Sequence, residues 1–86
     1  MLPFRHLIYT LAVAEHGSVQ AASDRISISQ PALSAAIQKV EENYGLKIFL
    51  RDRPNKLVLT PDGKRFIARA KVLMEGVEEF EDNVMN

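Results

Sequence analysis

The hydrophobic positions in the first part of the chain recur at helical spacing. They predict a helix over roughly residues 4–16, because five of them fall on one face of a 3.6-residue repeat. Gly17 follows as a C-terminal stop, since glycine readily takes the left-handed conformation that ends helices. The five positions on this face are Phe4, Leu7, Ile8, Leu11 and Ala14.

Two further helices are predicted between residues 18 and 45, joined by a tight turn at Ser27-Ile28. Ser18 and Ser29 are placed as N-caps, and Pro31 lies in a first helical turn, where a missing N–H costs little. The buried stripes are Val19, Ala22 and Ile26 in the first of these helices and Leu33, Ile37 and Val40 in the second, which ends near Tyr44-Gly45. Two short helices joined in this way predict a helix-turn-helix motif at about 19–38.

The pattern then changes to short strand-like runs at 47–50 and 56–60, with Pro and Asn in the intervening residues 52–55. This indicates a β-hairpin with a basic tip; we call residues 47–60 the wing. After Asp62-Gly63 a hydrophobic seam with 4-3-4-3-4 spacing predicts a last helix. The seam consists of Phe66, Ala70, Leu73, Val77, Phe80 and Val84.

The predicted fold is therefore mainly α. It is a winged helix-turn-helix of three helices plus a two-stranded β-hairpin over residues 1–60, followed by a long helix over 61–86. A seam of this length needs either the core of the first sixty residues or a second copy of itself. We favour a dimerisation helix, with packing onto the chain's own core as the alternative. Because the pattern still runs at Asn86, we expect this chain to be the front part of a longer protein.

The outward face of the third helix carries small, mostly uncharged residues, whereas solvated faces are usually rich in Glu and Lys. Short polar side chains suit a helix that enters a DNA major groove and contacts base edges, and Gln30 has the amide that pairs with adenine. Serine hydroxyls and helix N-termini suit phosphate oxygens. The candidate DNA-binding residues of the two helices are Ser18, Ser29, Gln30, Pro31, Ser34, Ala35 and Gln38.

The wing adds the candidates Arg53, Pro54, Lys56 and Thr60, and a basic hairpin tip suits a narrow minor groove. Charges are sorted along the chain: residues 51–71 carry seven bases and two acids, while 72–86 carry five acids and no base. The zero net charge therefore hides a basic region. For Arg51 we expect a structural ion pair with Glu41 rather than a contact to DNA.

Composition and motif spacing argue against other classes of function. Eighty-six residues with 47% hydrophobic content predict one small globular domain, and the absence of cysteine fits a reducing cytosol. His6 and His16 have no spacing typical of metal ligands, and we find no catalytic constellation, so we expect no enzyme, metal or cofactor. The uncharged run from Leu7 to Ala14 is far below the ~20 residues of a membrane span, and an export leader is missing.

The combined motifs resemble the N-terminal domain of LysR-type transcriptional regulators. The resemblance covers about residue 4 to Gly63, with the last helix similar to that family's linker helix. The residues that carry it are Leu7-x-Tyr9, Ala14-Glu15-x-Gly17-Ser18, Ala21-Ala22, Ile28-Ser29-Gln30-Pro31-Ala32-Leu33-Ser34, Ile37, Glu41, Gly45, Phe49-x-Arg51 and Leu59-Thr60-Pro61-x-Gly63.

The resemblance implies a bacterial, cytoplasmic, nucleoid-associated regulator that binds partly palindromic double-stranded DNA as a homodimer paired through the linker helix, and as a tetramer in many full-length members. It also implies a C-terminal effector domain, which we expect to lie outside these 86 residues, so we expect no inducer binding here. Gln30, Pro31 and Ser34 match family positions used on DNA, and Arg53 or Lys56 matches the wing.

Two features of the sequence depart from the family pattern. Ala35 stands where Arg is frequent, and the wing is one residue longer than in many members. The first departure argues against direct guanine readout by the third helix, and the second leaves open which of Arg53 and Lys56 enters the minor groove. The rival hypothesis is a protein-interaction module that uses the seam at 66–84 without binding DNA.

Overall fold

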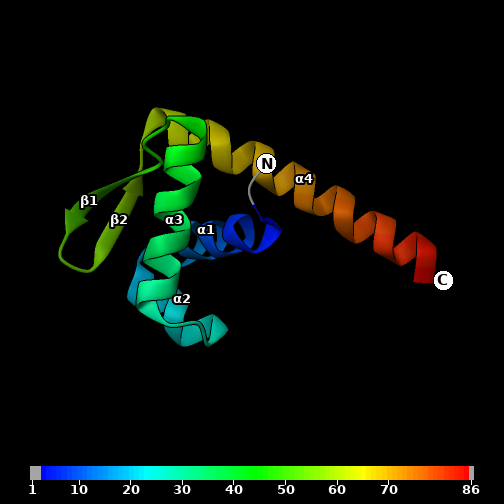
Figure 1. The fold of residues 1–86 in the computed structure, drawn as a ribbon, viewed down its shortest axis with the longest axis horizontal. Helices are drawn as coiled ribbons and strands as arrows, with labels where there is room; N and C mark the ends of the chain where they lie inside the picture. Colours follow the sequence, from blue (N-terminus) through cyan, green and yellow to red (C-terminus); the bar gives the residue numbers. More distant parts are fainter. Residues whose placement is uncertain (1–2, 86) are drawn as a thin grey trace.

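The computed structural model describes residues 3–85, and it has the predicted winged helix-turn-helix architecture (Figure 1). Three helices form the body, a two-stranded hairpin projects from it, and a long fourth helix leaves it. The elements in chain order are α1 (Phe4–His16), α2 (Val19–Ile26), α3 (Gln30–Tyr44), β1 (Phe49–Arg53), β2 (Lys56–Leu59) and α4 (Pro61–Met85).

The helix boundaries follow from the predicted capping residues. The hydroxyl oxygen of Ser18 accepts a 3.0 Å hydrogen bond from the N–H of Ala21, and Ser29 does the same for Ala32 at 3.2 Å. Each bond satisfies an N–H that has no partner inside its own helix. At the other ends, Gly17 and Gly45 have φ of 81° and 65°, the left-handed conformation expected of C-terminal glycines.

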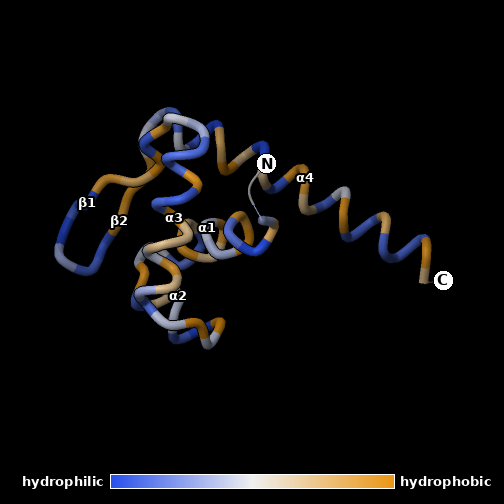
Figure 2. The backbone as a smooth tube through the Cα atoms, viewed as in Figure 1, coloured by the Kyte–Doolittle hydropathy of each residue, from blue (hydrophilic) through white to orange (hydrophobic). Residues whose placement is uncertain are grey.

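The core lies where α1, α2 and α3 meet the base of the wing. α1 lies across α3 (Figure 2), and hydrophobic residues of both helices are buried in one core cluster. The fully buried side chains include Val13, Ala22, Leu33, Val40 and Ile48, each with 0% exposure. Ala22 is fully buried in this core, on the stripe of the second helix that the sequence predicts to face inward.

β1 and β2 form an antiparallel hairpin in which Phe49 pairs with Leu59 and Arg51 with Leu57. The register shifts by one between Arg51 and Arg53, so Asp52 is the extra residue of a β-bulge. The N–H of Leu57 donates a 2.8 Å hydrogen bond to the carbonyl oxygen of Gly17, at the α1–α2 junction. This bond fixes the wing beside the N-terminus of α2.

α4 begins with a close contact between helix and wing base. The hydroxyl oxygen of Thr60 accepts a 2.8 Å hydrogen bond from the N–H of Gly63. A Cβ atom at Gly63 would overlap the carbonyl oxygen of Ile48, so only glycine fits there without a shift of backbone. From this anchor α4 runs past α1 and away from the body (Figure 1).

The hydrophobic seam of α4 is divided between two environments. Ala70 is buried against the chain's own core, and the ring of Phe66 packs on Tyr44 with centroids 5.5 Å apart. Leu73 and Phe80, by contrast, are 48% and 66% exposed. The alternative of packing onto the chain's own core therefore holds for the first part of the seam, and an interface remains a prediction for the rest. Within residues 3–85 no helix combines the length and hydropathy needed to cross a membrane.

Candidate nucleic-acid interface

The N-termini of α2 and α3 and the tip of the wing enclose an open hollow of about 200 Å³. It collects predicted residues that lie far apart in the sequence, which is the clearest functional feature of the fold. The residues that line it are Ser18, Val19, Gln20, Gln30, Ser34, Arg51, Pro54, Asn55, Lys56 and Leu57. Five of these were predicted as DNA-binding residues: Ser18, Gln30, Ser34, Pro54 and Lys56.

The exposed face of α3 has the composition that the sequence predicts. Leu33, Ala36, Ile37 and Val40 are buried on the core side, and all the candidates on the other side are exposed. These are Gln30, Pro31, Ser34, Ala35 and Gln38. Because no acidic side chain interrupts them, this part of α3 can approach an anionic surface closely.

Gln38 is tied to its own helix. Its side-chain N–H donates a 3.1 Å hydrogen bond to the Glu42 carboxylate one turn later. Gln30, at the first position of α3, is exposed and lines the hollow. Between the two glutamines, Gln30 is therefore better placed for bidentate pairing with a base.

The two capping serines have a second use. The oxygens of Ser18 and Ser29 already accept backbone N–H groups, but each hydroxyl keeps its own hydrogen to donate. A phosphate oxygen at either site would receive that hydrogen bond and would also lie at the positive end of a helix dipole. The geometry supports phosphate contacts at both caps.

The tip of the wing is exposed and basic. Arg53, Pro54 and Lys56 are all exposed, and Nε of Arg53 lies 3.7 Å from the carboxylate of Asp52 in the bulge. An exposed ion pair of this kind contributes little and is easily exchanged for another anion. Lys56 lines the hollow, whereas Arg53 is not among the residues that line it.

The predicted ion pair between Glu41 and Arg51 is wrong. The Glu41 carboxylate accepts hydrogen bonds from the backbone N–H groups of Ile48 at 2.7 Å and Phe49 at 3.4 Å, and its other oxygen lies 3.9 Å from Nζ of Lys47. Arg51 instead extends toward the tip, where its guanidinium donates a 2.9 Å hydrogen bond to the carbonyl oxygen of Pro54. The Glu41 carboxylate therefore binds backbone N–H groups where the wing joins the body, while Arg51 lines the hollow.

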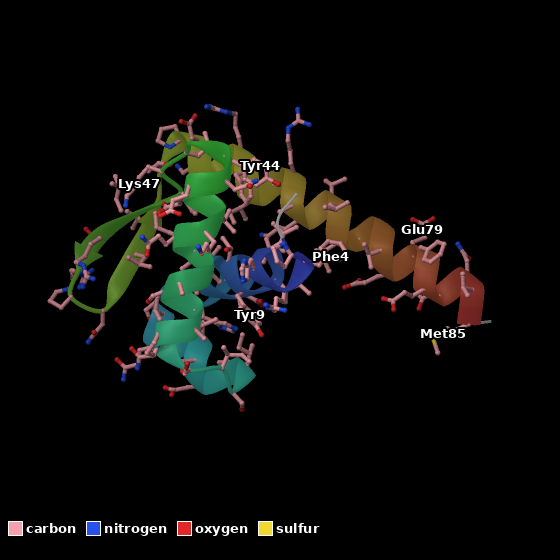
Figure 3. All side chains as sticks on the ribbon, viewed as in Figure 1. Phe4, Tyr9, Tyr44, Lys47, Glu79 and Met85 are labelled. Carbon is pink, nitrogen blue, oxygen red and sulfur yellow. The ribbon has the colours of Figure 1, made fainter. Side chains whose placement is uncertain are left out.

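Thr60 lies at the wing base rather than at its tip. Its hydroxyl donates to the carbonyl oxygen of Lys47 and accepts from Gly63, so both of its hydrogen-bonding roles are used inside the fold. This occupation argues for a structural role. In Figure 3 the neighbouring Lys47 lies between α3 and the wing, while Tyr44 lies beside the start of α4.

Sequence reasoning missed three polar residues of the hollow: Gln20, Arg51 and Asn55. A signal existed for two of them. Gln20 is the exposed second residue of α2, next to a capping serine, and Asn55 is in the turn of the wing. The hydrogen bond between Arg51 and Pro54 has no sequence signal, because it depends on the bulge at Asp52.

Comparisons with known proteins identify the family. Residues 4–64 match the family described as "Bacterial regulatory helix-turn-helix protein, lysR family". The chain is 42% identical over 80 residues to the HTH-type transcriptional regulator MetR of Haemophilus influenzae, a match covering 93% of this chain and 26% of that protein. It is 39% identical over 79 residues to the regulator BenM of Acinetobacter baylyi, covering 91% of this chain and 25% of BenM.

Solved structures agree with these sequence matches. A crystal structure of the BenM DNA-binding domain with catB site 1 DNA superposes with a TM-score of 0.91 at 33% identity, covering 98% of this chain and 92% of that one. A crystal structure of the CbnR DNA-binding domain with DNA gives a TM-score of 0.89 at 31% identity, covering 98% and 95%. The chain spans about a quarter of the length of the curated relatives it matches. It belongs to the lysR family of bacterial regulatory helix-turn-helix proteins.

Proposed function

We propose that this chain binds specific sequences of double-stranded DNA as part of a cytoplasmic bacterial transcriptional regulator. In this proposal α3 enters the major groove, and the tip of the wing lies in the adjacent minor groove. The backbone strand between the two grooves passes over the hollow. The chain acts through binding and not through catalysis, in agreement with the relatives, which are named as transcriptional regulators.

The observation that carries the proposal is the composition of the hollow. Ser18, the N-cap of α2, and Ser34 of α3 supply hydroxyl donors. Arg51 and Lys56 of the wing supply positive charge to the same hollow. Hydroxyl donors and positively charged side chains are both groups that contact the phosphates of a DNA strand. Gln30 lines the same hollow and is exposed at the start of α3, where its amide would meet base edges.

We further propose that two copies bind together to a partly palindromic site. A two-fold symmetric protein dimer matches DNA half-sites related by the same symmetry. The exposed apolar side chains of α4, Leu73 and Phe80 among them, are the surface that supports pairing. Relatives with DNA in their crystal structures share the fold over 98% of this chain.

Selection from a random duplex library tests this function. The protein is expected to enrich two related half-sites in inverted orientation, and their spacing would report the geometry of the dimer. Failure to enrich any sequence over successive rounds, by protein shown to be folded by circular dichroism, would overturn the proposal.

Salt dependence separates DNA binding from the rival interaction module. The affinity for an enriched site should fall steeply between low and moderate salt, because the basic side chains of the protein displace counterions from the DNA phosphates. Pairing through an apolar helix face should change little over the same range. A flat salt profile for the enriched complex would contradict contact with the phosphate backbone.

A further inference from the structure

The outward face of α3 carries an apolar patch between the polar side chains of Gln30 and Gln38. Pro31 and Ala35 are one helical turn apart on this face, and both are exposed. Ala32 is also exposed and lies three residues before Ala35, so the patch is continuous. Its side chains are hydrocarbon only and offer no hydrogen bond. They suit a part of a DNA groove that is itself apolar.

The patch contains no basic side chain. Lys39 is the only Lys or Arg in the sequence of α3, and it comes four residues after Ala35, in the second half of the helix. Guanine is read in the major groove by arginine or lysine, through its O6 and N7 atoms. Ser34, next to Ala35, has a short hydroxyl that discriminates little between bases. The first turns of α3 therefore lack the side chains that select guanine.

Thymine is the base whose major-groove edge matches such a surface, because it presents a C5-methyl group. Against a wholly polar base edge, Ala35 would cover a donor or acceptor atom without giving it a hydrogen bond, which is unfavourable. Against thymine, the two methyl groups bury apolar surface on each other. Alanine is also short, so the helix can lie close to the groove floor.

We infer that Ala35 is a specificity-determining residue, which selects thymine through its C5-methyl group. Pro31 lies about 6 Å from Ala35 along the helix axis, roughly the rise of two base pairs, so the patch covers neighbouring pairs of one half-site. With the amide of Gln30 on adenine, the half-site is rich in A·T pairs where α3 crosses it. The inference rests on the proposed DNA binding and adds the base that this patch selects and the atoms that carry the selection.

Deoxyuridine substitution tests the contact, because uracil lacks only the C5-methyl group of thymine. Anisotropy titrations would compare an enriched duplex with duplexes in which one thymine of a half-site at a time is replaced. Replacement at the contacted thymine should raise the dissociation constant of the wild type about three- to tenfold, the range for one buried methyl group. Wild-type binding that no replacement changes would overturn the inference.

Ala35→Gly assigns the effect to this side chain. The variant should bind the thymine and deoxyuridine duplexes with nearly equal affinity, because the methyl group that packs on thymine is gone. Any general weakening of α3 by glycine cancels, since both duplexes are compared on one variant. Lys39→Gly places the same residue at an exposed position outside the patch and should keep the wild-type difference. An Ala35→Gly protein that keeps the full difference would show that another residue contacts the methyl group.

5-Methylcytosine separates methyl recognition from hydrogen bonding. Changing the contacted T·A pair to C·G should weaken wild-type binding. Methylation of that cytosine at C5 should restore part of the affinity, because it places a methyl group at the same point in the major groove. Equal binding of the cytosine and 5-methylcytosine duplexes would mean that another atom of thymine is read, and the inference would be wrong.

The same measurements distinguish this inference from the proposed function. Enriched half-sites in which no thymine responds to deoxyuridine leave specific DNA binding in place and overturn only the role of Ala35. Folded protein that enriches no sequence overturns the proposed function, and the inference with it.

Discussion

The carboxylate of Glu41, in the last turn of α3, accepts a 2.7 Å hydrogen bond from the backbone N–H of Ile48, just before β1. This bond joins the helix that carries the candidate reading face to the base of the wing. Because Ile48 is fully buried, its N–H has little access to water if the acceptor is lost. One side chain therefore holds the two candidate DNA-binding elements in a fixed relation.

Replacing this acceptor should destabilise the fold. Glu41→Ala leaves the Ile48 N–H unpaired, and we expect the free energy of unfolding to fall by about 1–3 kcal/mol. Urea titration followed by circular dichroism measures the change. Glu42→Ala removes the next carboxylate, which is exposed, and should shift stability by less than ~0.5 kcal/mol. Equal losses in the two variants would contradict the role of Glu41.

Gly63 should tolerate no side chain. Gly63→Ala forces a methyl group onto the Ile48 carbonyl oxygen, so either α4 or the wing base must move. Overpacking of this kind costs about 1–3 kcal/mol, which would lower the melting temperature by several degrees. Lys64→Ala, at the next and exposed position, is the matched control. A Gly63→Ala protein that melts with the wild type would show that the contact is not tight.

Lys56 should contribute affinity without sequence preference. Lys56→Ala removes one positive charge from the hollow, so binding should weaken alike on all duplexes and the salt slope should fall by about 1. Fluorescence anisotropy at several salt concentrations measures both quantities. Lys71→Ala, a lysine of α4 outside the hollow, should leave them unchanged. A loss confined to one DNA sequence would assign Lys56 to base reading instead.

Ala35 offers a test by gain of function. It is exposed on α3, close to Ser34, where a longer donor could reach a guanine or a phosphate. Ala35→Arg should tighten binding to a suitable site by about 1–3 kcal/mol, the range of a good bidentate contact. Ala35→Leu adds bulk without donors and should bring no gain. Tighter binding by the leucine variant would mean that donors at this position are not what the surface lacks.

The helices and the wing were predictable because their determinants are local. Ser18 and Ser29 cap helices within three residues of themselves, and Gly17 and Gly45 end helices by their own backbone conformation. The candidate face of α3 was also predictable, since burial of Leu33 and its helical neighbours sets which side faces outward.

The remaining features depend on contacts between distant residues. The partner of Glu41 could not be predicted from charge alone, because backbone N–H groups at Ile48 and Phe49 carry no sequence signal as donors. The division of the α4 seam was hidden for the same kind of reason. Periodicity predicts that Ala70 and Phe80 share a stripe, but only the crossing with α1 decides that the first is buried and the second exposed.

Reading of bases by α3 is the central claim, and Gln30→Ala tests it most directly. Anisotropy titrations would compare the wild type and this variant on an enriched site and on every single-base change within one half-site. We predict a loss of about 1–3 kcal/mol on the enriched site, together with loss of preference at one base pair and unchanged preference elsewhere. An equal loss on all sequences, with every preference retained, would contradict base reading by Gln30.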